Sequence, residues 1–446
     1  MTTPNAHNLC DILEPDQASR VLLHRSSDRS PSSGSRIAMA CMVMKAAACS
    51  ALSPTLPAHN LKSSIGHPKL LVHHSIGSKV PGVQWKGYSG SNFGQKPMAM
   101  NVRASVSTAE GTELDAISKY SEVVPDTVIF DDFERFPPTA ATVSSSLLLG
   151  ITSVPKGAYN SAIDSALAYN KCYVENSGER LSCFLNKALV NVGAEVVKTV
   201  PGRVSTEVDA RLAYDTPGIV NEVHQLLELY DEVEVPRDRL LFKIPATWQG
   251  IEAVRQLEAE GIQTHVSLVY SFAQASAAAQ AGASVIQIFV GRIRDWSRTN
   301  SGDKYVDEAL ARGVDPGISL VTKAYNYIHK HGHKSKLMAA AVRNKQDVFS
   351  LLGLDYLIVP VKVLKSLKES KADLEDKYAF ARRLSPSVAK AATFSDDELQ
   401  KWDQGTFAKA LGPLAEDLLK RGLDGYINNT QRIEEHFSKI WPPPNV

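Results

Sequence analysis

The sequence lacks two features that would point to a membrane or to nucleic acid. It has no apolar run as long as a transmembrane helix, and it carries almost no excess charge, with 49 Lys plus Arg against 48 Asp plus Glu. A net charge of +1 therefore gives no reason to expect nucleic acid or an anionic membrane surface as a partner. The hydrophobic content of 43% and charged content of 22% are those of an ordinary globular protein.

Cysteine is scarce as well. The five cysteines form no CxxC pair and show no metal-ligand spacing: Cys10, Cys41, Cys49, Cys172 and Cys183. This pattern favours free thiols in a reducing compartment over a disulfide framework. His329, His331 and His333 resemble a metal cluster at first sight, but alternate residues do not share one face of a helix. We therefore expect no bound metal.

Acidic residues are missing from residues 29–109, although that stretch contains nine basic ones: Arg29, Arg36, Lys45, Lys62, Lys69, Lys79, Lys86, Lys96 and Arg103. A basic, Ser-rich stretch without acids is typical of an organelle transit peptide, and an ordinary disordered tail is the alternative. Four acids before this stretch fit a transit peptide poorly, so Met39 or Met42 is an alternative start: Asp11, Glu14, Asp16 and Asp28. We predict a disordered, transit-peptide-like extension over residues 1–104, processed near Val102–Ser105, and a folded domain over residues 105–446.

The folded part begins with a helix predicted over residues 113–120 and then alternates between short apolar runs and helical patterns. The eight runs predicted as strands are residues 127–131, 142–149, 203–208, 240–245, 264–269, 284–290, 336–342 and 356–361. Eight strand-then-helix units predict a (β/α)8 TIM barrel. An open doubly wound sheet is the alternative, but it would need a Gly-rich phosphate loop after its first strand, which is absent. Residues 294–317 are predicted as a polar insertion, and residues 395–441 as two or three extra C-terminal helices.

A single lysine, Lys243, lies inside the apolar run at residues 240–245. Burial disfavours the charged ammonium and shifts a lysine pKa towards neutrality, and a neutral amine attacks carbonyl carbon. We therefore predict that Lys243 forms a Schiff base with a sugar ketone. The alternatives are a lysine that snorkels from the strand end or one held in a structural ion pair.

Other polar residues share the interior face of the predicted barrel, near the C-terminal strand ends where barrel active sites lie. Glu207 is one strand away from Lys243 and fits the acid/base that carbinolamine chemistry needs, with a purely structural partner of Lys243 as the alternative. Asp131 fits the base that takes a substrate hydroxyl proton, unless it only caps the next segment. Ser267 is placed to hold a catalytic water, and Gln287 lies on the same face.

Two arginines follow the sixth and seventh predicted strands. Arg292 and Arg343 are placed to bind a substrate phosphate, a task that suits the planar fork of a guanidinium. For Arg292 the alternative is a surface ion pair with Asp295.

Four segments resemble the signature blocks of transaldolases, in the order and spacing of that family: Val204–Leu212, Lys243–Ile251, Ser271–Ala275 and Phe289–Ile293. The resemblance runs from about Asp126 to Val361. It implies a (β/α)8 barrel and a cofactor-free enzyme of the non-oxidative pentose phosphate pathway, whose partners are small sugar phosphates. Such an enzyme moves a dihydroxyacetone unit from sedoheptulose 7-phosphate to glyceraldehyde 3-phosphate. The N-terminal extension resembles that of plant plastid forms and implies the chloroplast stroma, or the cytoplasm if it is no transit peptide.

The resemblance also implies roles for single residues. It makes Lys243 the Schiff-base lysine, Glu207 the water-linked acid/base and Asp131 the group that handles the hydroxyl proton. Ser267 stands where the family usually has a water-binding Thr. Arg292 and Arg343 match the phosphate-binding arginines, and Phe289 matches the active-site Phe.

Three positions depart from the family pattern. Ser144 replaces the Asn that binds the dihydroxyacetone unit, and Gln287 and Ala341 stand where many members have Ser. Each change removes or lengthens a hydrogen bond to substrate, worth about 0.5–1.5 kcal/mol. These departures keep one alternative open, a barrel that has lost turnover and binds sugar phosphates. A second alternative is an aldolase on the same barrel that releases dihydroxyacetone to water; the lifetime of the intermediate separates it from a transaldolase, and Phe289 favours transfer by the family resemblance. The oligomeric state stays open, with a homodimer among the options.

Overall fold

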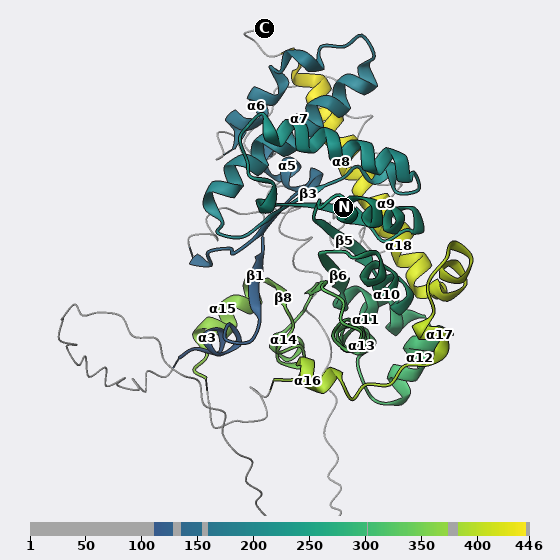
Figure 1. Cartoon of the computed structure of the whole chain (residues 1–446). Helices are drawn as coiled ribbons and strands as arrows, with labels where there is room; N and C mark the ends of the chain where they lie inside the picture. Colours follow the sequence, from purple (N-terminus) through teal and green to yellow (C-terminus); the bar gives the residue numbers. More distant parts are fainter. Residues whose placement is uncertain (1–110, 128–134, 154–158, 301, 373–381, 443–446) are drawn as a thin grey trace, which may run out of the picture. The chain divides into compact units, whose positions relative to one another are not determined.

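The computed structural model describes residues 111–127, 135–153, 159–300, 302–372 and 382–442. Its centre is a sheet of eight strands, with the helices placed around them (Figure 1). The strands are β1 (Glu122–Asp126), β2 (Ala141–Val143), β3 (Val204–Glu207), β4 (Leu240–Pro245), β5 (Thr264–Val269), β6 (Val285–Phe289), β7 (Lys336–Ala340) and β8 (Tyr356–Pro360). Within these ranges no helix is long and apolar enough to cross a membrane. The predicted extension, residues 1–104, lies outside them.

The sheet order is β1-β8-β7-β6-β5-β4-β3-β2, and every paired neighbour is parallel. In the described part of the chain the only step around the ring without a ladder is the one from β1 to β2, which we call the seam. The (β/α)8 barrel prediction is therefore confirmed, with the sheet nearly closed.

One or more helices follow each strand except β1 in the described part of the chain, and α3 precedes β1. The helices are α3 (Glu113–Ile117), α5 (Ser145–Thr152), α6 (Asn160–Leu167), η1 (Asn170–Cys172), α7 (Ser177–Thr199), η2 (Ala210–Leu212), α8 (Thr216–Asp231), η3 (Arg237–Arg239), α9 (Trp248–Ala259), α10 (Phe272–Ala281), α11 (Val290–Thr299), α12 (Lys304–Ala311), α13 (Pro316–Lys330), α14 (Lys345–Ser350), α15 (Val361–Glu369), α16 (Pro386–Ala389), α17 (Asp396–Leu399) and α18 (Gln404–Ile440). Their apolar faces pack on the outside of the sheet in one large core and a smaller separate cluster, which is formed mainly by α5, α6, α7 and the end of α18.

Local chemistry fixes the turns that follow the central strands. After β4, the hydroxyl oxygen of Thr247 accepts the backbone N–H of Gly250 at 2.9 Å and starts α9. Gly250 is needed there, because a Cβ would lie 2.1 Å from the carbonyl oxygen of Pro245. After β5, Ser271 and Gln274 form a reciprocal capping box that starts α10. These turns hold the C-terminal strand ends, where the polar interior residues lie.

Three sequence predictions are wrong in position. The first strand is β1, not residues 127–131, of which residues 128–131 lie outside the described part. The second strand ends at Val143, because the hydroxyl oxygen of Ser144 accepts the backbone N–H of Leu147 and starts α5. The segment 294–317 is mostly helical, in α11 and α12, rather than a polar insertion.

The predicted C-terminal helices are present, and most of them form one long element. Helix α18 bends where Gly412 has φ 78° before Pro413. It contacts α5, α7, α9, α10, α11 and the strand β5, and it runs along the barrel as the long yellow helix in Figure 1. One helix thus spans both the central strands and the helices near the seam.

Cys172 and Cys183 form a disulfide between η1 and α7, with their Cα atoms 5.5 Å apart. The prediction of free thiols is therefore wrong for these two residues. Their spacing matches no recognisable motif, and only the fold shows that α7 turns back onto η1. Cys10, Cys41 and Cys49 lie outside the described residues.

Candidate active site

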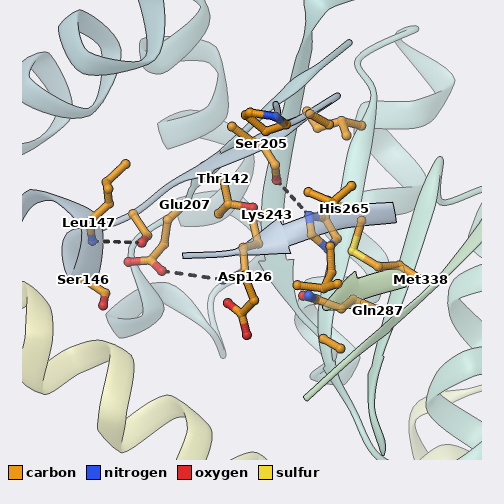
Figure 2. A pocket seen from close by; sticks show the side chains of 18 of the residues that line it. Asp126, Thr142, Ser146, Leu147, Ser205, Glu207, Lys243, His265, Gln287 and Met338 are labelled. Carbon is orange, nitrogen blue, oxygen red and sulfur yellow. Dashed lines mark hydrogen bonds and ion pairs between the residues drawn. The ribbon is translucent and has the colours of Figure 1, made fainter. Parts of the chain in front are cut away.

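Lys243 lies at the centre of a cavity of about 380 Å³ in the barrel interior. In the strand register Lys243 pairs with Glu207 of β3 and with His265 of β5. Figure 2 shows its side chain between those two residues. The lysine is 8% exposed, so its amine meets ligands in the cavity rather than bulk water.

Glu207 is the nearest carboxylate to that amine, with Lys243 Nζ 3.8 Å from Glu207 Oε2. Burial alone would lower the pKa of Lys243, but Tyr426 and Glu207 outweigh it, and the pKa lies above its ordinary value. The expected shift towards neutrality is therefore absent in the free site. Because the resting amine is charged, Lys243 must lose a proton before it attacks a carbonyl, and Glu207 is placed to accept it.

Ser145, which sequence reasoning missed, holds Glu207 from the seam side. Its hydroxyl donates to Glu207 Oε1 at 2.6 Å and its backbone N–H donates to the same oxygen at 3.2 Å. Both residues are buried. Two donors on one oxygen fix the carboxylate and leave Oε2 facing Lys243. The only sequence signal is that Ser145 follows the capping residue Ser144.

A different carboxylate from the predicted one lines the cavity. Asp126, the last residue of β1, is in the cavity wall, and Figure 2 shows it among the side chains around Lys243. Asp126 remains exposed as a residue, but the protein around its carboxyl partly desolvates it and raises its pKa, while the positive charge of Arg292 acts against that rise. Asp131 lies outside the described residues, and the strand that was predicted to carry it ends at Asp126. The carboxylate placed by the structure is therefore Asp126.

Ser267 and Gln287 meet on the far side of Lys243 from Glu207. Ser267 is fully buried, and its hydroxyl lies 3.4 Å from Gln287 Oε1 and 3.4 Å from the hydroxyl of Tyr426. Gln287 lines the cavity. The structure thus places Gln287 in the cavity wall and Ser267 behind it, in contact with Gln287 and with Tyr426, a residue that sequence reasoning missed.

Of the two predicted phosphate-binding arginines, Arg292 lines the cavity and Arg343 does not. The Arg292 guanidinium lies 4.6 Å from the ring centre of Phe289 and donates to the Tyr270 hydroxyl at 3.1 Å. Arg343 is half exposed and pairs with Asp295 at 2.6 Å. The surface pair considered for Arg292 is therefore formed by Arg343 instead, and Arg292 has only neutral neighbours among these contacts.

Ser144 lines the cavity, but its hydroxyl oxygen already accepts the Leu147 N–H at 3.3 Å. The side chain therefore combines a capping role with its place in the cavity wall.

His265 is a further buried residue that sequence reasoning left unassigned. Its Nδ1 lies 2.8 Å from the hydroxyl of Ser205, a contact drawn in Figure 2. Burial and the nearby charge of Lys243 lower the pKa of His265 to about 3, so the ring is neutral at physiological pH. A neutral ring adds no positive charge to compete with Lys243.

The described residues contain no cluster of three His, Cys, Asp or Glu side chains that could hold a metal ion. His329 packs on Tyr325 at 4.2 Å between ring centres, while His331 and His333 pack on Tyr327 at 4.9 and 5.3 Å. These three histidines take part in aromatic packing at the end of α13.

Comparison with known proteins gives one consistent family. Residues 123–437 match the model of the transaldolase/fructose-6-phosphate aldolase family. The chain is 40% identical over 313 residues to transaldolase A of Pasteurella multocida, an alignment that covers 70% of this chain and 96% of that protein. It is 38% identical over 328 residues to a transaldolase of Mannheimia succiniciproducens, covering 73% of this chain and 98% of that protein. A transaldolase of Haemophilus influenzae is 39% identical over 313 residues, covering 70% and 96%.

Proposed function

Because this chain belongs to the transaldolase/fructose-6-phosphate aldolase family and is a transaldolase, we propose that Lys243 is its Schiff-base lysine. The observation that carries the proposal is the buried amine of Lys243, 3.8 Å from the Glu207 carboxylate in the wall of the barrel cavity. A buried amine beside a fixed carboxylate is the arrangement that carbinolamine formation and dehydration need.

The first half-reaction forms the covalent intermediate. Glu207, directly or through a water, takes a proton from Lys243, and the free amine attacks the ketose carbonyl. The carbonyl oxygen leaves as water after protonation, and a protonated imine remains on Lys243. Asp126 then takes the proton of the substrate's C4 hydroxyl, the bond between C3 and C4 breaks, and an aldose phosphate leaves.

The second half-reaction uses the same groups in reverse. The dihydroxyacetone unit stays on Lys243 as an enamine and attacks the aldehyde carbon of the acceptor. The new alkoxide takes its proton from Asp126, and water releases the product ketose. Arg292, at the cavity wall, binds the phosphate of donor and acceptor. Sedoheptulose 7-phosphate is the donor and glyceraldehyde 3-phosphate the acceptor in this proposal.

Mass spectrometry after borohydride reduction tests the role of Lys243. The full chain is incubated with fructose 6-phosphate, reduced, and compared with a Lys243→Ala variant. We expect a reduced dihydroxyacetone adduct on Lys243 in the wild type and none in the variant. A folded wild-type protein without adduct would contradict the proposal and favour a barrel that binds sugar phosphates without turnover.

An aldolase that passes the intermediate to water is the second candidate, and the substitutions at Ser144 and Gln287 favour it because both line the cavity around the intermediate. The two activities are separated by the products formed from fructose 6-phosphate without an acceptor. Free dihydroxyacetone, released at a rate close to that of transfer, would indicate the aldolase.

We also propose that residues 1–104 are a plastid transit peptide. The support is their acid-poor, basic composition and the alignments with bacterial relatives, which leave about 30% of this chain unmatched while covering nearly all of theirs. An import assay with isolated chloroplasts tests it: we expect uptake and cleavage near residue 104. Uptake by a chain that begins at residue 105 would contradict the proposal.

A further inference from the structure

Tyr426 of α18 lies over the amine of Lys243, although 183 positions separate the two in the sequence. Lys243 Nζ is 4.4 Å from the centre of the Tyr426 ring. Tyr426 also lines the cavity, and its hydroxyl lies 3.4 Å from Ser267 Oγ. The steps assigned above to Glu207 and Asp126 give this aromatic ring no role.

The docking of α18 on the barrel places that ring. Gly422 lies one helical turn before Tyr426, on the same face of α18. A Cβ at Gly422 would lie 2.7 Å from Cδ2 of Leu268, at the C-terminal end of β5. The glycine therefore lets the helix approach the strand end closely. Leu268 itself has φ 59°, a left-handed conformation that the packing must hold.

The face of α18 that carries Tyr426 is otherwise a buried packing stripe. Its other members are buried at helical spacing: Leu419, Gly422, Leu423, Thr430, Ile433 and Phe437. Tyr426 packs against the core as a partly buried residue and also lines the cavity. The helical spacing alone would predict an ordinary core residue at position 426. Packing does not require that this residue be aromatic or that its ring lie over a reactive amine.

We propose that Tyr426 is a further catalytic residue of this site, whose ring face stabilises the positive charge of the Schiff base on Lys243. This inference rests on the proposed role of Lys243. The charge arises when the amine and the ketone condense: a C–N bond forms, the carbonyl oxygen leaves as water, and one proton remains on the imine nitrogen. An aromatic face within about 6 Å of a desolvated cation attracts it through the ring quadrupole.

The charges around Lys243 agree with this role. Glu207 and Asp126 bring carboxyl groups, Arg292 brings a positive charge, and His265 is neutral. Burial and Arg292 oppose a charged nitrogen at Lys243, whereas Tyr426 and Glu207 favour it and raise the pKa of the amine. For Tyr426 that pKa effect comes from its hydroxyl, while the ring face acts through its position 4.4 Å from the amine. Glu207 must change its protonation during the reaction, so the ring is the constant source of stabilisation.

Two substitutions separate the ring from its hydroxyl. Tyr426→Phe keeps the ring, and Tyr426→Leu removes it while keeping an apolar side chain that excludes water. Tyr214→Leu is the control, because Tyr214 is 65% exposed and is absent from the cavity lining. The full-length proteins are incubated with fructose 6-phosphate over a pH series and trapped with borohydride, and the adduct on Lys243 is quantified.

We expect Tyr214→Leu to form wild-type amounts of adduct, Tyr426→Phe to lose no more than about twofold, and Tyr426→Leu to form at least about fivefold less at limiting ketose. The pH midpoint of adduct formation should move to lower pH in Tyr426→Leu, and further than in Tyr426→Phe, because burial of the amine is then opposed by neither the ring nor the hydroxyl. A merely structural loss that admits water would move it to higher pH.

Each of the other outcomes contradicts either the role of the Tyr426 ring or the role of Lys243. Wild-type behaviour of Tyr426→Leu contradicts the inference while leaving Lys243 as the Schiff-base residue. Equal losses in Tyr426→Phe and Tyr426→Leu assign the effect to the hydroxyl and its contact with Ser267, against the ring. An absent adduct in the wild type contradicts the role of Lys243 and the inference together.

Discussion

The strands β3, β4 and β5 differ from the two seam strands β1 and β2 in burial and in how well the sequence indicates them. Every residue of β3, β4 and β5 is buried. In β1 only Val124 and Pro125 are buried, and in β2 only Val143. Both groups supply the site: Glu207, Lys243 and Ser267 come from the central strands, and Asp126 comes from the seam.

The difference follows from pairing. A parallel strand with a neighbour on each side and helices outside buries both faces, so its sequence is a near-continuous apolar run. The bounds of β4 and β5 are accordingly those predicted. Among the described residues β1 and β2 pair on one side only. Their sequences mix polar and apolar residues, and the apolar run Val128–Phe130 just after β1 gave the stronger strand signal.

The largest expected loss of activity comes from replacing the carboxylate that the seam contributes to the site. Asp126→Asn should lower kcat/KM by about 10²-fold or more, because the amide cannot take the substrate hydroxyl proton. Asp131→Asn should stay within about threefold of the wild type. Steady-state transfer from fructose 6-phosphate to erythrose 4-phosphate measures both, with thermal unfolding as the check on folding. The reverse ranking of the two variants would restore the original assignment to Asp131.

The site residues predicted correctly from the sequence lie on the central strands, whereas Asp126 and Ser145, which were missed, lie at the seam. Lys243 was found because it is a charged residue inside an apolar run, which the chain tolerates only for a reason. Glu207 and Ser267 were found because they lie on the interior face of the strands predicted next to it. Asp126 ends a strand whose position was misjudged. Ser145 was missed because α5 starts where a strand was expected.

Tyr426 was missed for another reason: it lies at helical spacing among core residues of a helix far along the chain. Only the path of α18 across the barrel shows that this position meets Lys243. Local patterns therefore predict the strands and their interior residues, while contacts between distant elements need the fold.

The disulfide offers a way to weaken the helices near the seam while leaving the side chains of β4 and β5 unchanged. Cys172, Phe184 and Phe437 belong to a separate core cluster formed by α5, α6, α7 and the end of α18. Loss of a bridge that closes a short loop should cost about 2–3 kcal/mol. Cys183→Ser should therefore lower the urea midpoint of unfolding, and a reducing agent should lower that of the wild type by a similar amount.

The same reducing agent should leave Cys183→Ser unchanged, which provides the internal control. Since the bridge lies in the seam-side cluster, unfolding of that part should begin first, detected by hydrogen exchange in α6 and α7 before β4 and β5. Simultaneous loss of protection in both regions would show that the seam-side helices and the central strands unfold as one unit.

The smallest expected effect on activity concerns Ser145, which lies beside the seam and donates hydrogen bonds to Glu207 of β3. Ser145→Ala removes the 2.6 Å hydrogen bond to Glu207 but keeps the backbone donor at 3.2 Å. A hydrogen bond to a charged group contributes about 1.5–3 kcal/mol, and with one donor left we expect about a tenfold loss of kcat. KM should change little, because Ser145 is absent from the cavity lining.

Two matched variants separate positioning from stability. Ser145→Thr keeps a hydroxyl and should recover most of the activity. Ser144→Ala removes the cap of α5 and should lower stability by about 1 kcal/mol. If Ser145→Ala lost stability but kept kcat, its hydroxyl would serve packing alone. If it lost kcat while Ser144→Ala lost only stability, then α5 orients the acid/base on β3, and the weakly paired seam contributes directly to the chemistry of the central strands.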